Sequence, residues 1–409
     1  MKNPLPGRAP TETARARQKA GGGLAARIPS LVAAWRKARG RPASGKLERR
    51  EVEEAGAALL ALQRGLTGER RLAGERYMER PELLGAYLLY YWPVSYMQAS
   101  LALAELPSVP RRVLDLGSGP GPVSAALLDA LRDSGAPLPA ELVLADASPA
   151  ALELASAILA GGAARPAKLS TLELDLEAEP ELPAGGFDLV VMGHCLNELW
   201  RGRSDSLDRK LGLLERAGRS LAPGGRVLLV EPALLLTCRE LIALRDRLAA
   251  EGWSVLGPCP GSYACPALAA GPERSCHAES PWAPPEPVAS LAAAAGLDRS
   301  SVKWTYFFLE PGSGPRDPRP SLGGFRRRVV SDPMLNKAGR LRYILCDDGE
   351  LSAISARADD EAARAAGFMD LRRGDAIRAE GLEERPGGGL GIGSGSRLEL
   401  VSRAPEAAS

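Results

Sequence analysis

The chain has 409 residues, of which 45% are hydrophobic, which is enough for roughly two or three domains with buried cores. Its six cysteines are too few for the disulfide framework of a secreted protein, and clustered thiols inside cells more often bind a metal. The longest apolar stretch, 83–97, is shorter than a membrane span and contains Pro93, and no signal-peptide core follows the start. We therefore predict a soluble intracellular protein without a membrane partner.

Positive charge is concentrated at the beginning of the sequence. Residues 1–50 contain 13 Lys or Arg and two acids, so residues 51–409 carry −9 although the whole chain carries +2. Such a segment is typical of proteins that contact a phosphate backbone. We predict a disordered basic arm over 1–46. A disordered solubilising tail is one alternative. A mitochondrial transit peptide is another, but Pro and Gly interrupt the long amphipathic helix that a transit peptide would form.

The next region, 47–107, has apolar residues at helical spacing and ends in an aromatic run over 87–96. We predict an N-terminal helical region whose aromatic side chains lie in a core or at a domain interface.

From residue 108 onward, strand and helix patterns alternate. Strands are expected at 113–116, 141–145, 169–174, 189–192 and 227–230, with helices such as 120–132 and 149–159 between them. This alternation predicts a parallel sheet with helices on both faces, in a Rossmann-like α/β domain over 108–311.

The pattern is interrupted at 257–285, which is rich in Pro, Gly and Cys. This composition indicates an inserted loop that needs a cross-link, such as a bound metal, to hold it in place. A helix at 288–295 and a late strand at 302–309 resume the fold. Beyond these, short strands at 340–345, 350–355, 376–381 and 397–401 predict a small β-rich, OB-like extension over 312–403.

The first strand leads into a glycine-rich loop, Asp115-Leu-Gly117-Ser-Gly119-Pro-Gly121. A dinucleotide fingerprint would require glycine at position 122, where this chain has proline. The acid followed by alternating glycines instead resembles the first motif of class I methyltransferases. That resemblance implies that Asp115 and the backbone of Gly117, Gly119 and Gly121 hold the amino-acid end of S-adenosylmethionine.

Two further acids follow strands of the predicted sheet. Asp146 ends the second strand, where an acid accepts hydrogen bonds from ribose hydroxyls in nucleotide-binding Rossmann units. Asp175, after the third strand, is either an acceptor for the adenine amino group or a solvated loop acid.

The fourth strand ends at Gly193-His-Cys-Leu-Asn-Glu-Leu, at the edge that faces the acceptor substrate in class I methyltransferases. His194 is a candidate base, and Asn197 and Glu198 are candidate catalytic residues or helix caps. The Asn/Asp-Pro-Pro-aromatic motif of amino-directed nucleic-acid methyltransferases is absent, so the sequence does not define an acceptor atom and leaves catalysis open.

Four cysteines are candidate metal ligands: Cys259, Cys265, Cys276 and Cys346. Four thiolates suit tetrahedral zinc or an iron–sulfur cluster, and His277 is an alternative ligand. Cys195 and Cys238 lie in strand and helix patterns, and we interpret them as buried apolar residues.

In combination, DLGSGPG, GHCLNEL, PCPGSYACP…CH and the late RYILC resemble the methyltransferase-like assembly factors of the mitochondrial small ribosomal subunit and their bacterial relatives. The resemblance covers about 75–401. It implies a [4Fe–4S] cluster on the four cysteines, contact with 16S-type rRNA and a role in small-subunit maturation.

Two functions from different classes follow. One is an rRNA methyltransferase, and the other is a non-catalytic assembly factor in which S-adenosylmethionine and a cluster order RNA-binding surfaces. A zinc-containing methyltransferase of a non-RNA substrate is the third interpretation. We expect a monomer in a bacterial cytoplasm, with the mitochondrial matrix as the alternative.

Overall fold

The computed structural model of the chain describes residues 19–43, 45–68, 77–260, 264–312, 327–347, 349–385, 388–393 and 395–408. The chain forms two compact units. The larger unit comprises Lys19–Leu322 together with Glu406–Ser409, and the smaller one contains Gly323–Pro405. Residues 1–18 of the predicted basic arm lie outside the described ranges. No helix within those ranges combines the length and apolarity that crossing a bilayer requires.

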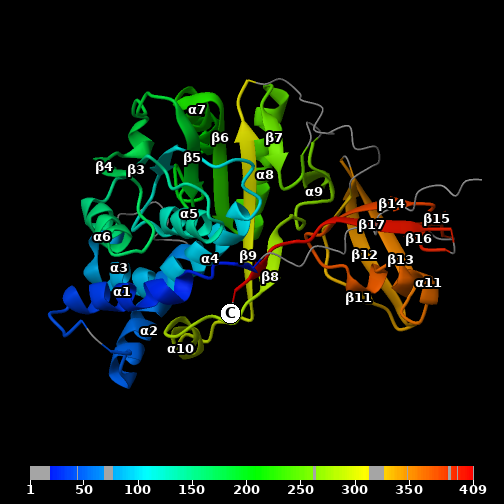
Figure 1. Cartoon of the computed structure of the whole chain (residues 1–409), viewed down its shortest axis with the longest axis horizontal. Helices are drawn as coiled ribbons and strands as arrows, with labels where there is room; N and C mark the ends of the chain where they lie inside the picture. Colours follow the sequence, from blue (N-terminus) through cyan, green and yellow to red (C-terminus); the bar gives the residue numbers. More distant parts are fainter. Residues whose placement is uncertain are drawn as a thin grey trace, which may run out of the picture. The chain divides into compact units, whose positions relative to one another are not determined.

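The larger unit is built on a mixed sheet (Figure 1). Its strands are β2 (Arg112–Leu116), β3 (Glu141–Asp146), β4 (Lys168–Glu173), β5 (Phe187–Gly193), β6 (Leu221–Pro232), β7 (Ser254–Gly257), β8 (Ala278–Pro281) and β9 (Ser301–Glu310). They lie in the order β4-β3-β2-β5-β6-β9-β7, and β8 also pairs with β9. The strands from β4 to β6 are parallel, whereas β9 runs antiparallel to β6 and to β7. The predicted α/β sheet and its late strand are confirmed.

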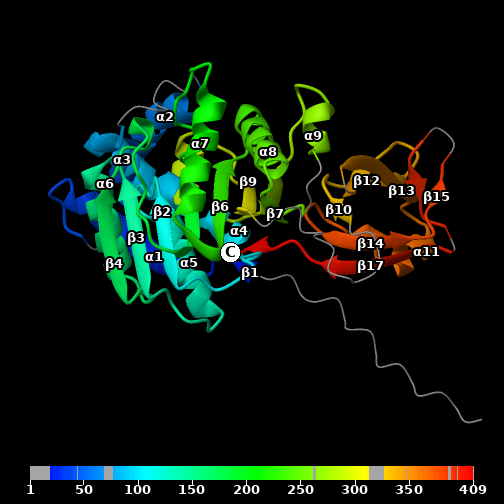
Figure 2. The same cartoon turned by 90° about the horizontal axis from the view of Figure 1, so that it is seen from above.

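Helices cover both faces of this sheet, because alternate side chains of each buried strand point to opposite sides (Figure 2). The helices are α1 (Leu24–Lys37), α2 (Arg49–Gln63), α3 (Pro81–Ala86), α4 (Trp92–Leu103), α5 (Pro122–Asp133), α6 (Pro149–Ala160), α7 (Ser206–Arg219), α8 (Leu235–Ala250), α9 (Pro266–Ala269) and α10 (Val288–Ala294). Val113 and Val191 belong to one core cluster with α1, α4, α5 and α6. Leu114 and Val190 belong to the other, with α7 and α8.

The region predicted as a disordered arm differs from the structure over part of its length. Residues 24–37 form α1, in which Leu31 and Trp35 are buried, and Arg27 is only 4% exposed. The guanidinium of Arg27 donates to both carboxylate oxygens of Asp129 in α5 at 2.9 and 3.0 Å, and Tyr96 donates to the same carboxylate at 2.9 Å. At least this part of the basic charge is therefore used inside the fold.

The two ends of the described chain pair with each other. The short strand β1 (Lys19–Ala20) pairs in parallel with β18 (Glu406–Ala407). The backbone N–H of Ala407 also donates to the hydroxyl of Ser280 in β8 at 3.0 Å. After the smaller unit, the chain therefore returns to the larger one.

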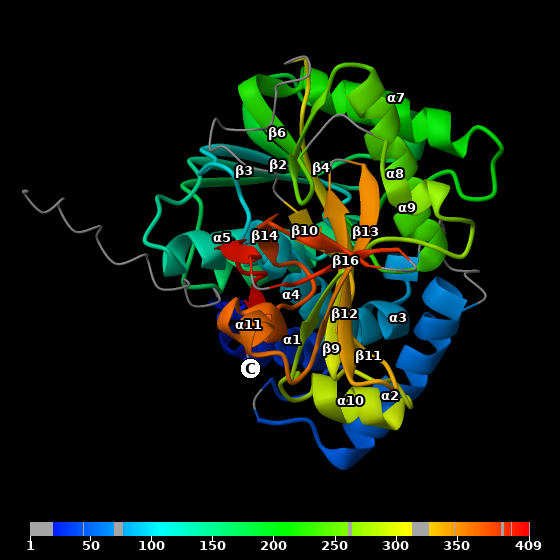
Figure 3. The same ribbon diagram turned by 90° about the vertical axis from the view of Figure 1, so that its right-hand side faces the viewer.

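The smaller unit is a mostly antiparallel sheet with its own core (Figure 3). Its elements are β10 (Arg327–Val329), β11 (Met334–Leu335), β12 (Arg340–Asp347), β13 (Glu350–Arg357), α11 (Glu361–Ala365), η5 (Phe368–Asp370), β14 (Ala376–Glu380), β15 (Glu383–Glu384), β16 (Leu390–Gly391) and β17 (Arg397–Ser402). Tyr343, Ile354 and Phe368 are buried in the core. The expected short strands are present. Pairing among the described residues follows an open path, β15-β16-β13-β12-β10-β14-β17, so the OB-like interpretation stays a prediction.

We predict that Arg27→Leu lowers the free energy of unfolding by about 3–5 kcal/mol, because it leaves the buried Asp129 carboxylate without its bidentate partner. Urea denaturation measures the loss. Arg49→Ala, which removes an exposed pair with Glu53, is the control and should leave stability unchanged. A double variant, Arg27→Leu with Asp129→Leu, should recover much of the loss. Equal effects of Arg27→Leu and Arg49→Ala would contradict the structural role of the buried pair.

Candidate functional site

The glycine-rich loop lies between β2 and α5, at the carboxyl edge of the parallel strands. Gly117, Gly119 and Gly121 all have positive φ, at 66°, 50° and 77°. A Cβ at Gly117 would lie 2.6 Å from the Cβ of Cys195, whereas the nearest neighbour of a Cβ at Gly119 would be 3.7 Å away. Glycine is therefore required at Gly117 for both conformation and space, and the backbone at Gly119 leaves room for a ligand.

Asp115 lies at the base of this loop and is 1% exposed. Its Oδ2 accepts a hydrogen bond from the hydroxyl of Ser124 at 2.6 Å. Its Oδ1 is buried, with no hydrogen-bond partner among the described residues. Burial raises the pKa of this carboxyl to about 7. A buried acceptor of this kind fits a donor group on a ligand.

Asp146, at the end of β3, fastens the loop to the neighbouring strand. Its Oδ2 accepts the backbone N–H of Gly119 at 2.8 Å, and its Oδ1 accepts that of Ser148 at 2.9 Å. Burial raises the pKa of Asp146. Because each carboxylate oxygen has two lone pairs, Asp146 retains acceptor capacity for ribose hydroxyls while it holds the loop.

The aromatic run that precedes the sheet contributes to the same site. The indole N–H of Trp92 donates to the carbonyl of Pro120 in the glycine loop at 2.9 Å. Tyr87 is buried, and burial raises the pKa of its hydroxyl, which also hydrogen-bonds with Ser95. The negative charges of Glu198, Asp146 and Asp115 are close enough to raise this pKa as well. These aromatics were predicted to lie in a core or at a domain interface. Their sequence pattern does not indicate that Tyr87 and Trp92 are neighbours of the site, because the contact is set by tertiary packing.

Beyond β5, His194 and Asn197 lie beside a buried acid on β6, Glu231. His194 has φ of 61°, and its Nε2 is buried with no hydrogen-bond partner among the described residues. Burial lowers the pKa of His194 to about 4, so the imidazole is neutral at physiological pH. Asn197 donates its carboxamide N–H to Glu231 at 2.8 Å and to the carbonyl of His194 at 3.3 Å. Asn197 therefore positions this turn.

Glu231 was missed by the sequence analysis. It is 1% exposed, and burial raises the pKa of its carboxyl to about 7, although the hydrogen bonds from Asn197 lower it. The one signal in the sequence is an acid at the end of the otherwise apolar 227–230 run. Glu231 lies near the carboxyl end of β6, much as Asp146 lies at the carboxyl end of β3. Strand β6 is the neighbour of β5, whose carboxyl end is the predicted acceptor edge.

Cys195 lies between these acidic groups. Its thiol donates to the carbonyl of Leu116 at 3.4 Å. Burial raises the pKa of this thiol well above its ordinary value, and the nearby carboxylates of Glu231, Asp115, Asp146 and Glu198 act in the same direction. Cys195 is therefore a protonated packing residue against Gly117, consistent with its interpretation as an apolar position. Glu198 belongs to the same group of acids.

Asp175 lies after β4, where its carboxylate accepts the backbone N–H of Glu177 at 3.0 Å and begins the short helix η4 (Leu176–Ala178). This is a capping role at an exposed position. The predicted contact with adenine stays a prediction.

The predicted metal ligands are divided between the units. Cys259, Cys265 and Cys276 lie in the larger unit, and Cys346 lies in β12 of the smaller one. Within the described ranges, no three Cys, His, Asp or Glu side chains converge on a point that a metal ion would occupy. His277, the alternative ligand, lies 3.9 Å from the carboxylate of Glu279. The four-cysteine ligand set therefore stays a prediction.

Helix α8 fixes the segment that carries the first three cysteines. Arg239 donates to the carbonyls of Gly271 and Arg274 at 2.8 and 2.7 Å. The carboxylate of Asp246 accepts the backbone N–H of Cys265 at 3.0 Å. Burial raises the pKa of the Cys265 thiol, and Cys259 lies near enough to raise it further. Two of the thiols are thus close together on a segment held by charged side chains.

The strand order and the glycine loop with its two strand-end acids define a protein with the class I methyltransferase fold. The family model described as mitochondrial small ribosomal subunit Rsm22 matches residues 84–356, from the aromatic run through β13. The chain belongs to this family, which confirms the resemblance inferred from the combined motifs. A comparison with curated proteins gives no match.

Solved structures similar to the chain include ribosomal protein L11 methylase from Lactobacillus delbrueckii subsp. bulgaricus, at 20% identity and a TM-score of 0.28 over 39% of this chain and 68% of that one. An S-adenosylmethionine-dependent methyltransferase from Mesorhizobium loti matches at 23% identity with a TM-score of 0.25, over 32% of this chain and 51% of that one. The mitomycin 7-O-methyltransferase MmcR matches at 22% identity with a TM-score of 0.34, over 50% of this chain and 64% of that one. The chain spans about half to two thirds of these proteins, and similarities this remote carry no information about substrate.

We predict that Asp115→Asn stabilises the protein at pH 8 but not at pH 4. Burial raises the pKa of Asp115 from 3.8 to about 7, so between these values the folded state keeps a proton that the unfolded state has released. The stability that this proton provides is complete below about pH 4 and is lost as the pH rises to about 7. The asparagine still accepts from Ser124 and has no charge to bury.

Urea denaturation at both pH values measures this effect. Asp208→Asn, at an exposed position, is the matched control and should behave like the parent at each pH. A loss of stability at pH 8 in Asp115→Asn would contradict the assignment.

Proposed function

We propose that this chain binds S-adenosylmethionine at the carboxyl edge of its parallel sheet and methylates rRNA of the small ribosomal subunit. One observation carries the proposal. A glycine loop is fastened to Asp146, beside the buried carboxyl of Asp115, whose Oδ1 has no hydrogen-bond partner among the described residues. The loop leads into the start of α5, so acceptor carboxyls and a helix N-terminus lie along one short segment, which suits a ligand with both ammonium and carboxylate groups.

The residues present fit this cofactor. The Oδ1 of Asp115 is an acceptor for the cofactor's amino group. The N–H groups of Gly117, Gly119 and Gly121 donate within the fold, so the proposed role of these glycines is the close approach of their backbone to the amino-acid end of the cofactor. Asp146 accepts from the ribose hydroxyls, and Asp175 is the proposed adenine contact. When bound, S-adenosylmethionine supplies a methyl group on a positively charged sulfur, and the surrounding carboxyls of Asp115, Asp146 and Glu231 suit that charge.

On the acceptor side, the candidate residues differ in what they can do. The neutral imidazole of His194 has an unengaged buried nitrogen that can accept a proton from an acceptor base. Glu198 lies among the same acids. Asn197 positions this turn through Glu231 and is not assigned contact with the acceptor.

The partner follows from the family, whose name places its members with the mitochondrial small ribosomal subunit. We propose 16S-type rRNA as the substrate and a monomer as the acting form. The family name favours the mitochondrial alternative for the compartment, and the bacterial cytoplasm is the setting expected from the sequence.

A second candidate is a non-catalytic assembly factor that binds S-adenosylmethionine to order its RNA-binding surfaces. The observation that favours it is that Asn197 donates its carboxamide N–H to Glu231 and to the His194 carbonyl, which gives this side chain a positioning role within the turn.

We also propose that Cys259, Cys265 and Cys276, together with Cys346, bind a [4Fe–4S] cluster, with zinc as the alternative metal. The proximity of Cys259 to Cys265 and the anchoring of their segment by Arg239 and Asp246 support the ligand set in the larger unit. Thiolates are the usual ligands of both metal centres.

The experiment that tests the function uses anaerobically purified protein, methyl-labelled S-adenosylmethionine and small subunits from cells that lack the protein. Label in rRNA that disappears with Asp115→Ala would establish an RNA methyltransferase. Stable co-sedimentation without label, in protein that binds the cofactor, would favour the assembly factor. Label confined to protein or small molecules would overturn both.

We predict that Asp146→Ala weakens S-adenosylmethionine binding by about 1–3 kcal/mol, because it removes the ribose acceptor and releases the N–H of Gly119. Titration calorimetry measures the affinity. Asp133→Ala removes an exposed acid at the far end of α5 and should leave binding unchanged. Equal affinities for both variants would exclude the ribose role.

We predict that Cys265→Ser removes the brown absorbance and most of the iron from anaerobically purified protein, and increases proteolysis between residues 257 and 346. Cys238→Ala, at a buried position within α8, is the control and should retain its iron. Full iron content in Cys265→Ser would show that the ligand assignment is wrong, and zinc alone in the parent protein would favour the zinc alternative.

A further inference from the structure

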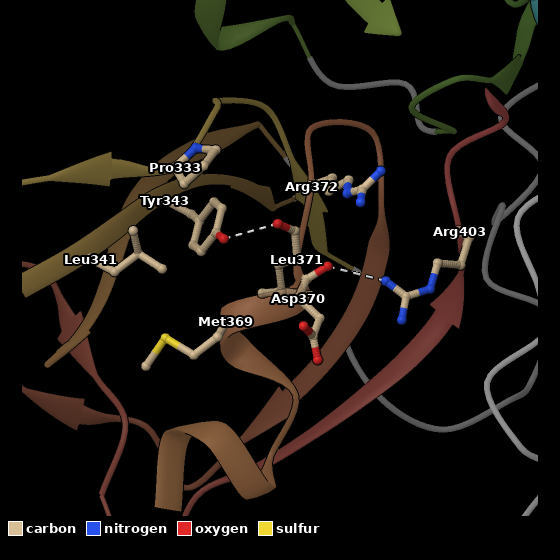
Figure 4. A pocket seen from close by; sticks show the side chains of 8 residues that line it. All are labelled: Pro333, Leu341, Tyr343, Met369, Asp370, Leu371, Arg372 and Arg403. Atoms are coloured by element: carbon tan, nitrogen blue, oxygen red, sulfur yellow. Dashed lines mark hydrogen bonds between the residues drawn. The ribbon is translucent and has the colours of Figure 1, made fainter. Parts of the chain in front are cut away.

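The smaller unit contains a cavity of about 560 Å³ that the sequence analysis did not anticipate (Figure 4). It lies between β12, η5 with the loop that follows it, and the residues after β17. Its volume falls within the range of about 300–1,000 Å³ that is typical of small-molecule sites. The proposed cofactor site is in the larger unit, so this cavity is separate from it.

One side of the cavity, here called its floor, is formed by Tyr343, which is held in place by its neighbours. Tyr343 is 1% exposed, and its hydroxyl donates to the carbonyl of Leu371 at 2.9 Å (Figure 4). Its ring also packs edge-on against Phe368, with centroids 5.2 Å apart. Above this floor, the half-buried side chains of Leu341 and Met369 form an apolar wall.

Two arginines lie at the rim, and one buried acid organises the segments that carry them. Asp375 is fully buried. Its carboxylate accepts the backbone N–H of Arg372 at 3.1 Å and that of Ala404 at 2.9 Å, and it lies 3.5 Å from the guanidinium of Arg403. Arg403 also donates to the carbonyl of Asp370 at 3.2 Å (Figure 4).

The position of the Arg403 guanidinium is therefore set by the fold. Its bonds to Asp370 and Asp375 both use one nitrogen, Nη1, and the guanidinium has further donors on its other nitrogens. A guanidinium held in this way loses little freedom when it binds a phosphate group.

We propose that this cavity binds one unpaired nucleotide of an RNA strand. Arg372 and Arg403 hold the phosphate, and the base lies against Leu341 and Met369. Asp370, at the same rim, accepts a hydrogen bond from the ribose 2′-hydroxyl. The inference rests on the proposed function, since it supplies a contact site for the rRNA partner.

An acidic peptide is the other ligand class that two arginines suggest, and the structure favours RNA over it. A peptide carboxylate has no use for the apolar wall of Leu341 and Met369, and it brings no hydroxyl donor for the carboxylate of Asp370. A nucleotide combines an anionic group, a flat apolar face and hydroxyl donors, and each of these has a counterpart in the cavity.

The test measures binding of the full chain to a short, fluorescently labelled single-stranded RNA. Arg372→Ala should weaken binding roughly tenfold and lower the slope of affinity against salt concentration by about one. Met369→Glu, which places a charge on the apolar wall and leaves the contacts of Asp375 intact, should weaken binding by a similar factor. Arg364→Ala removes an exposed charge from α11, outside the cavity, and is the matched control with unchanged affinity.

Photocross-linking of the parent protein to RNA that contains 4-thiouridine provides a readout without substitution, and the cross-links should map to the segments around Met369 and Arg403. Parent-like binding by Arg372→Ala and Met369→Glu, absence of RNA binding by the parent, or displacement of RNA by a polyglutamate peptide would overturn the inference. Cofactor affinity and co-sedimentation with small subunits are measured on the same preparations. If both persist while the cavity variants bind RNA normally, the proposed function stands and the inference fails.

Discussion

The site in the larger unit depends on one hydrogen bond, from the backbone N–H of Gly119 to the carboxylate of Asp146. Parallel strands bring their carboxyl ends to one edge of the sheet, so the loop after β2 always lies beside the end of β3. The bond converts this proximity into a fixed loop shape, and the indole of Trp92 holds the same loop from the other side, at Pro120. With the loop fixed, only glycine fits at Gly117, and Cys195, in the segment that follows β5, packs directly against it.

The same edge concentrates buried carboxyl groups, and two of them, Asp115 and Glu231, form no salt bridge with the residues that the structure describes. Asp115 and Glu231 lie near the carboxyl ends of β2 and β6, with β5 between them, and burial raises the pKa of each to about 7. A fold selected for stability alone would have apolar side chains at such places. Burying these carboxyl groups costs free energy, and a cationic ligand with several hydrogen-bond donors would offset that cost. His194, uncharged and strained at positive φ, lies at the same edge, directly after β5.

Local patterns in the sequence predicted the sheet, because its strands are short apolar runs bounded by turns. The DLGSGPG motif predicted the loop, because glycines at alternate positions permit the positive φ angles of a tight turn. Glu231 and Tyr87 escaped prediction for the opposite reason: their role comes from strands and helices that meet only in three dimensions. The basic arm was misjudged over 24–37, since composition does not distinguish an arginine that faces solvent from Arg27, which is paired with an acid 102 residues away. The four proposed cysteine ligands belong to two units, so their spacing along the chain does not predict whether they meet.

The pairing of β1 with β18 makes the smaller unit an insertion within the larger one, because the chain leaves at β9 and comes back before residue 406. A domain inserted in this way has two covalent connections to its host, which confine it more than a single linker would confine an appended domain. It is also a module that can be exchanged: a different domain could replace Gly323–Pro405 without disturbing β1, β18 or the glycine-rich loop. Recombination could therefore give one methyltransferase-type host a new binding specificity, with the host's own sheet left intact.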